Sequence, residues 1–459
     1  MKNFLPPFLC CLLCLLTACS SLSVNQMPDV AAIPPEWQQL SVGNKTLERT
    51  ARVLDPALVA VQEQALRTSP TVLVAALRWT RARQASADAG LDRQPQFGLK
   101  LEACRGSPRD AGTCAADVLL SARAGYEVDL WSRLRNTELA RFADAAARSN
   151  DLEAARRLIR SDVTEQYWAL GAIGKLVRLT ELQLQDAQDF QAVIEAKVRH
   201  GAALAQQVDA AASQLETVRG RLAALRRERV EREQVMRILL GSSAIPILAQ
   251  AALPQGTPDG LDEVGTPAAV LERRPDVQSA RRGVDAVLAR LRVANAARYP
   301  TLSLDTGAIA GAGGHWIGQP VATLVAGLVV PLVEWRRLQL RSEASRTDLE
   351  IAAVALRDTV VRALAEIEAL AARRKELRFQ RAVRAQFLQK ATRGEHSARA
   401  RVASGTLSRG DWLLASGTLS RGDWLLARGS LHAAQADSVA LRLAEWRSIL
   451  ALQRALALD

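Results

Sequence analysis

The chain has 459 residues, of which 49% are hydrophobic, and a formal net charge of +12. So many apolar residues exclude a disordered protein, because such a chain can bury more than one ordinary core. Arg makes up 53 of the 60 basic residues, and these arginines are scattered among 48 acidic residues along helix-like segments. This pattern favours solvated helix faces over a nucleic-acid-binding protein, whose basic residues would cluster.

The N-terminus is predicted to be a signal peptide over residues 1–18. Its apolar run from Phe8 to Leu16 is too short to span a membrane as a mature helix. The tetrapeptide Leu16-Thr17-Ala18-Cys19 resembles a bacterial lipobox, which implies cleavage before Cys19 and a diacylglycerol on its thiol. Ser20 follows, and the resemblance then implies sorting to the outer membrane. We therefore expect a lipid-anchored arm over residues 19–55.

The remaining chain is predicted to form two structural repeats, residues 56–260 and 261–459. Each repeat holds two prolines 25 residues apart, and the two pairs are offset by 205 residues: Pro70 and Pro95, then Pro275 and Pro300. Proline fixes φ and lacks an N–H donor, so it tends to open or end a helix. Each pair therefore predicts a helix that is followed by a different kind of element.

Alternating sequences after each closing proline predict β-strands. In the first of them Leu99 and Leu101 alternate with Lys100 and Glu102, which gives one apolar and one polar face. The expected strands cover residues 96–104, 117–130, 301–311 and 321–333, and the last is apolar on both faces. Strands of roughly ten residues in an exported, lipid-anchored chain favour a membrane barrel.

Cys104 and Cys114 flank a loop that contains Gly, Pro and Asp, between the first two expected strands. The chain would reach an oxidising compartment, where disulfides form and persist. We therefore expect a disulfide between these two cysteines rather than two free thiols.

Very long helices are predicted after each pair of strands. No proline occurs from Arg109 to Ile245 or from Leu332 to Asp459. Apolar residues recur with coiled-coil spacing in both stretches: Val163, Leu170, Val177 and Leu184 in the first, and Leu356, Val360, Ala363, Ile367 and Leu370 in the second. A helix from about Asn136 to Arg199 would be roughly 95 Å long, so it must span a distance rather than fill a globular core. We expect two helical hairpins, with tips near residues 199–209 and 402–428.

The second tip carries a twelve-residue phrase, ASGTLSRGDWLL, written twice without change at residues 403–414 and 415–426. The first repeat has room for one phrase only, so twelve residues are an insertion at the hairpin turn, and either copy can be the added one. Each phrase contains two glycines, which disfavour helix, whereas a longer loop costs little. We expect the extra residues to bulge at the tip, as an accident that the fold tolerates rather than an adaptation for docking.

Several of these segments together resemble the TolC-like outer-membrane efflux proteins, specifically the lipoprotein branch that serves resistance-nodulation-division pumps. The resemblance covers nearly the whole mature chain. It is carried by the lipobox at Cys19, ERRPDVQSA at Glu272–Ala280, the prolines before the strands with Arg298-Tyr299-Pro300, GYEVDLWSRLRN at Gly125–Asn136, and GTLSRGDWL at the tip.

The resemblance implies a mixed α and β fold with a two-fold internal repeat, four membrane β-strands per chain and long α-helical hairpins. Four strands cannot close a barrel, and an open edge in lipid leaves backbone groups unpaired, so several chains must combine. The family implies a homotrimer whose 12-strand β-barrel continues as an α-helical barrel. A periplasmic adaptor would dock at the tip and join the channel to an inner-membrane pump.

The family's tips match the pattern Gly-x-x-Ser-x-x-Asp, with carboxylates at the narrowest point. Ser408 and Asp411, or Ser420 and Asp423, fit the pattern, whereas the first repeat departs from it with Leu204 and Gln207 in those places. A ring of Asp there would attract cations, and the alternative is that the Asp caps the returning helix. The candidate gate and docking residues are Gly201, Gln207, Asp209, Gly405, Ser408, Asp411, Gly417, Ser420, Arg421 and Asp423.

No motif indicates an enzyme, and we expect no metal and no cofactor apart from the lipid. The four histidines are isolated, and those near the tip, His200 and His432, are expected to be solvated. The sequence thus favours a passive efflux duct in the outer membrane that extends into the periplasm. The alternatives are an outlet for type I polypeptide secretion and a periplasmic coiled-coil spacer without a pore.

Overall fold

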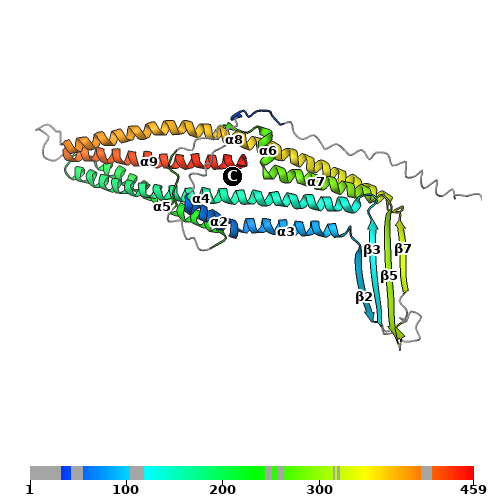
Figure 1. The fold of residues 1–459 in the computed structure, drawn as a ribbon. Helices are drawn as coiled ribbons and strands as arrows, with labels where there is room; N and C mark the ends of the chain where they lie inside the picture. The colour runs from blue at the N-terminus through cyan, green and yellow to red at the C-terminus, as the bar shows by residue number, and fades with distance from the viewer. Residues whose placement is uncertain are drawn as a thin grey trace, which may run out of the picture.

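The computed structural model describes residues 33–42, 55–103, 118–242, 251–256, 263–313, 316–317, 321–404 and 416–458. The molecule is elongated, with a β-sheet at one end and long helices over the rest of its length (Figure 1). Its two longest helices are α4, Arg133–Arg199, and α8, Trp335–Ser404, with 67 and 70 residues. At 1.5 Å per residue each helix measures roughly 100 Å. Within the described ranges, no helix has both the length and the apolar character needed to cross a membrane.

The sheet has four main antiparallel strands in the order β2-β3-β5-β7. They are β2 Gln96–Ala103, β3 Val118–Val128, β5 Thr301–Gly313 and β7 Val321–Val329, and the short β6 Trp316–Ile317 pairs with the end of β5. β5 is two residues longer than the expected strand over residues 301–311. The fourth ends at Val329 rather than at residue 333, because Pro331 has no N–H to continue a ladder.

The two faces of the sheet differ in polarity, as the alternation predicted. The register pairs Leu99 with Ala122 on one face and Lys100 with Ser121 on the other. Exposed apolar side chains line the first face: Phe97, Leu99, Leu101, Leu120, Leu304, Leu324 and Leu328. The second face carries the charged side chains, among them Arg123, Asp305 and an ion pair between Lys100 and Glu102.

The helices form a wall four helices wide. Next to the sheet the neighbours are α3 Pro70–Leu91, α4, α7 Pro275–Ala296 and α8; toward the other end α5 Ala205–Leu240 replaces α3, and α9 Ser416–Ala455 replaces α7. The short helices α2 Pro56–Thr68 and α6 Pro267–Arg273 also begin with proline, which suits a first turn. The spacing predicted the buried stripe of α8: Leu356, Val360, Ala363 and Ile367 are at most 5% exposed, and Leu370 is partly buried.

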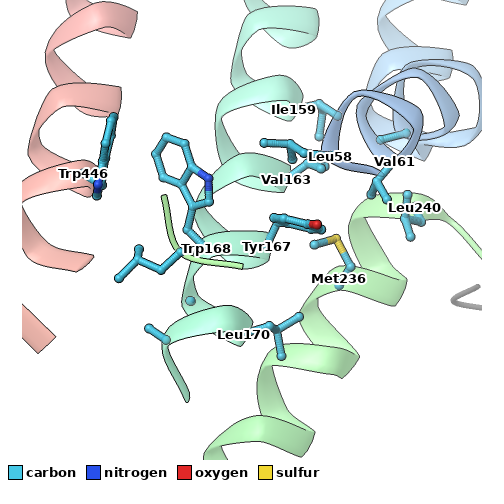
Figure 2. Close-up of a cluster of buried hydrophobic side chains, with 14 of the residues drawn as sticks. Leu58, Val61, Ile159, Val163, Tyr167, Trp168, Leu170, Met236, Leu240 and Trp446 are labelled. Carbon is cyan, nitrogen blue, oxygen red and sulfur yellow. The ribbon is translucent and has the colours of Figure 1, made fainter. Parts of the chain in front are cut away.

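The largest buried cluster among the described residues lies near the middle of the wall and includes side chains of α2, α4, α5 and α9 (Figure 2). Tyr167 is fully buried there, and its hydroxyl donates a hydrogen bond to Asp55 Oδ2 at 2.6 Å. This bond and one from the Ala57 N–H hold the pKa of Asp55 below its usual value, so Asp55 is a charged N-cap of α2. The ring centroids of Trp168 in α4 and Trp446 in α9 are 5.3 Å apart, and both side chains belong to the cluster.

The described part of the N-terminal arm is bound across the helices. β1, Ser41–Val42, pairs in parallel with β4, Glu263–Val264, and Trp37 Nε1 donates to the Gly265 carbonyl at 2.8 Å. The backbone N–H groups of Gln38 and Gln39 donate to the two carboxylate oxygens of Glu368 in α8. The arm therefore joins the segment before α6 to the long helix α8.

Two glycines of α4 test how closely this helix packs against residues 252–253. A Cβ at Gly171 would lie 2.7 Å from backbone atoms of Ala252 and Leu253, whereas a Cβ at Gly174 would meet nothing within 4 Å. We expect Gly171→Ala to lower the unfolding free energy by about 1–3 kcal/mol through overpacking. Gly174→Ala should raise it by up to about 1 kcal/mol through helix propensity. Thermal unfolding of the two purified variants checks this, and shifts in the same direction would contradict the close approach.

Candidate functional site at the ends of the helical hairpins

The first hairpin turns at Gly201, immediately after α4 ends. Gly201 has φ of 70°, a left-handed conformation that residues with a Cβ rarely adopt. The Ala202 N–H donates to the Lys197 carbonyl at 2.8 Å, and the Gly201 N–H donates to the Val198 carbonyl at 2.9 Å. These two bonds are those of a Schellman motif, so glycine is what ends the helix here.

The returning helix α5 begins sooner than expected. The turn comprises residues 200–204, and Gln207 and Asp209 lie in the first turns of α5 with exposed side chains. Their role at the tip stays a prediction. Leu204 is the N-cap, is 71% exposed and makes no capping hydrogen bond with its side chain. A Ser at this position could accept one, so the departure from the family pattern removes a helix cap.

The second hairpin places the two copies of the doubled phrase differently. α8 ends at Ser404, and Gly405, Ser408 and Asp411 of the first copy lie outside the described residues. The second copy is almost entirely helical, because α9 begins at Ser416. Its candidate residues Gly417, Ser420, Arg421 and Asp423 therefore lie in the first turns of α9.

The second copy is helical because packing against α4 outweighs the low helix propensity of its glycines. That twelve extra residues bulge at the tip stays a prediction, because residues 405–415 lie outside the described residues. A Cβ at Gly422 would lie 3.7–3.8 Å from the side chains of Phe190, Val193 and Lys197, and Leu425 is 2% exposed. Asp423 is exposed and well inside α9, so it does not cap this helix.

Deleting one phrase tests this placement. Because the copies are identical, deletion of residues 403–414 or 415–426 yields the same chain. The remaining copy can still supply the contacts that Gly422 and Leu425 make now, so we expect an unchanged oligomer in gel filtration. Efflux in a strain that lacks its own duct should be unchanged or improved. A lost oligomer would show that the repeat is structural, and lost efflux with the oligomer retained would show that it serves docking.

A buried charged cluster lies behind the tip, between α4 and α9. Asp186 of α4 is 4% exposed, and it accepts a hydrogen bond from Arg428 and contacts His432 Nδ1 through Oδ2 at 2.9 Å. The Arg428 guanidinium lies 4.4 Å from the Trp424 ring centroid. Trp424 Nε1 in turn donates to Glu395 Oε1 of α8 at 3.0 Å. The cluster thus joins three long helices at the end of the molecule that carries the hairpin turns.

The sequence did not predict this cluster. His432 was expected to be a solvated histidine, but its side chain is 13% exposed and has Asp186 as partner. The two residues are 246 positions apart, so no local spacing could indicate the contact. His200 is exposed at the end of α4, as expected.

The arrangement is suited to holding helices together rather than to catalysis. Across the described ranges, no group of three or more His, Cys, Asp or Glu side chains could hold a metal ion. The lipid anchor at Cys19 and the cysteines Cys104 and Cys114 lie outside the described residues, so the lipid and the disulfide stay predictions.

A model of the family described as outer membrane efflux protein matches residues 61–242 and 266–458. The chain belongs to this family. It is an outer-membrane efflux channel that extends into the periplasm, and family members are channel proteins rather than enzymes.

Similar proteins share most of the length of the chain. The pyoverdine export outer membrane protein OpmQ of Pseudomonas putida is 26% identical over 386 residues, which are 78% of this chain and 80% of that protein. The cation efflux system protein CusC of Escherichia coli O6:H1 is 24% identical over 315 residues, 65% of this chain and 66% of that protein.

Solved structures show the same fold. The outer-membrane channel OprN has a TM-score of 0.79 at 20% identity, covering 95% of this chain and 98% of that one. The open state of the Neisseria gonorrhoeae MtrE outer membrane channel has a TM-score of 0.72 at 18% identity, covering 94% and 97%.

Proposed function

We propose that three copies of the chain form one continuous duct. The observation that carries this proposal is the pair of edges on each copy. β2 and β7 are the edge strands of the sheet. The outer helices of the wall are α3 and α5 on the side of β2, and α8 on the side of β7. Edge strands with unpaired backbone groups are not tolerated in lipid. Joining β2 of one copy to β7 of the next would give a 12-strand β-barrel continued by an α-helical barrel.

The polarity of the sheet supports the orientation of this barrel. The face with Leu99 and Leu324 would contact lipid, and the face with Lys100, Arg123 and Asp305 would line the water-filled interior. The diacylated Cys19 would add a second attachment to the membrane through the arm. A disulfide between Cys104 and Cys114 would brace the loop beyond β2.

The duct would serve as the exit of a tripartite efflux system. A periplasmic adaptor would dock at the hairpin ends, near Gly201 and the doubled phrase, and an inner-membrane pump would supply the energy. The duct itself would conduct small molecules passively. The relatives named for pyoverdine export and cation efflux support small substrates over the polypeptides of a type I outlet.

Conductance in planar bilayers tests the duct. The purified full-length chain is expected to give discrete channels, and a coiled-coil spacer would give none. Complementation of a strain that lacks its own duct tests the efflux role: restored resistance to small drugs is expected, whereas restored export of a polypeptide alone would favour type I secretion.

A further inference from the structure

Three aromatic side chains gather where the sheet meets the helices. Trp131 lies between β3 and α4, Tyr299 between α7 and β5, and Trp335 at the start of α8 after β7. The rings of Trp131 and Tyr299 stack with centroids 4.7 Å apart, and Trp131 Nε1 donates to the Pro300 carbonyl at 2.8 Å. Trp and Tyr favour the boundary between hydrocarbon and water, because their rings are apolar with one polar atom.

Exposed apolar residues precede two of these aromatic residues in the sequence. Leu130 is 55% exposed, Leu332 is 78% exposed and Val333 is 100% exposed. Trp335 follows them and is 46% exposed. The chain therefore changes from apolar to polar over a few residues, which indicates that the hydrocarbon of the membrane ends at this level.

Arg298 is held at this boundary without a carboxylate partner among the described residues. Its guanidinium lies 4.7 Å from the Trp335 ring centroid, and its Nε is buried and makes no hydrogen bond. Arg133, at the same junction, is instead neutralised by Glu127, with Nη2 2.6 Å from Oε2. A guanidinium that is oriented by a ring and has no carboxylate partner is suited to bind a phosphate oxygen.

We propose that Arg298 binds the phosphate of an anionic phospholipid in the leaflet that faces the periplasm. The acyl chains would lie along Leu332 and Val333, and Trp335 would hold the guanidinium at the level of the headgroup. The proposal rests on the sheet being the membrane-inserted part of the duct. It does not depend on which molecules the duct carries.

Native mass spectrometry of the full-length protein in detergent tests the site, with phosphatidylglycerol and phosphatidylcholine of equal chain length as probes. We expect Arg298→Gln to weaken phosphatidylglycerol binding about fivefold per site, the effect of one basic residue at an anionic surface, and to reduce the preference over phosphatidylcholine. Trp335→Leu, which keeps the charge but removes the ring, should weaken binding as well. The control is Arg292→Gln. It removes an exposed arginine inside α7, six residues before Arg298, and should leave phosphatidylglycerol binding unchanged.

Unchanged phosphatidylglycerol binding in both the Arg298 and Trp335 variants would overturn the proposal. So would equal displacement of the lipid by inorganic phosphate at matched concentration, because the ligand would then be free phosphate. The same spectra give the oligomeric state, so a wild-type protein that is not a trimer would count against the proposed duct, whereas a trimer without lipid preference would count against this site.

Discussion

Leu99→Arg is expected to prevent insertion of the channel into the outer membrane. Leu99 is 81% exposed on the apolar face and pairs with Ala122 near the middle of β3, so its side chain would lie deep in the bilayer. An Arg near the midplane costs about 2–4 kcal/mol in a membrane barrel, and a trimer would carry three of them, which exceeds the margin of stability of many proteins.

The matched control introduces the same residue one position earlier. Gly98 lies on the polar face, and a Cβ there would meet nothing within 4 Å, so Gly98→Arg should insert normally and alter only conductance. Membrane fractionation and the heat-resistant oligomer on gels measure insertion. Equal loss in both variants would contradict the assigned faces.

Asp186→Ala is expected to loosen the start of α9 from α4. Removing the carboxylate leaves Arg428 and His432 facing each other in a site where Asp186 is 4% exposed. Breaking a buried ion pair costs about 3–5 kcal/mol, and we expect a loss of about 2–4 kcal/mol because Arg428 keeps 26% of its side chain exposed.

Hydrogen exchange should locate this loss in the first turns of α9, and the resting conductance of the channel should rise if the hairpin end is its narrow point. Glu181→Ala is the control on the same helix. It breaks a pair with Arg226 in which the side chains are 47% and 63% exposed, so the loss should be at most about 0.5 kcal/mol. Protection of α9 that is the same in both variants would show that Asp186 does not hold the hairpin.

The sequence predicted the elements whose signals are local. Alternation of Leu99, Lys100 and Leu101 fixes which side of β2 each residue occupies, because side chains of a strand point to alternate faces. Spacing of three and four residues predicted the buried stripe of α8 at Leu356 and Val360 in the same way. Gly201 ends its helix because of its own backbone freedom, so its role could also be expected without knowing the fold.

Only the tertiary structure decided what each buried face packs against. Periodicity indicates that a residue is buried but not which distant residue it meets, so the contact between Asp186 and His432 could not be predicted. The second copy of the phrase contains Gly417 and Gly422, and propensity favours a loop there, yet contacts of Gly422 and Leu425 with the packed core keep α9 helical from Ser416. The physical reason is the same in both cases: helix and strand signals are set by neighbours in sequence, whereas the free energy of packing depends on partners that only the folded chain brings together.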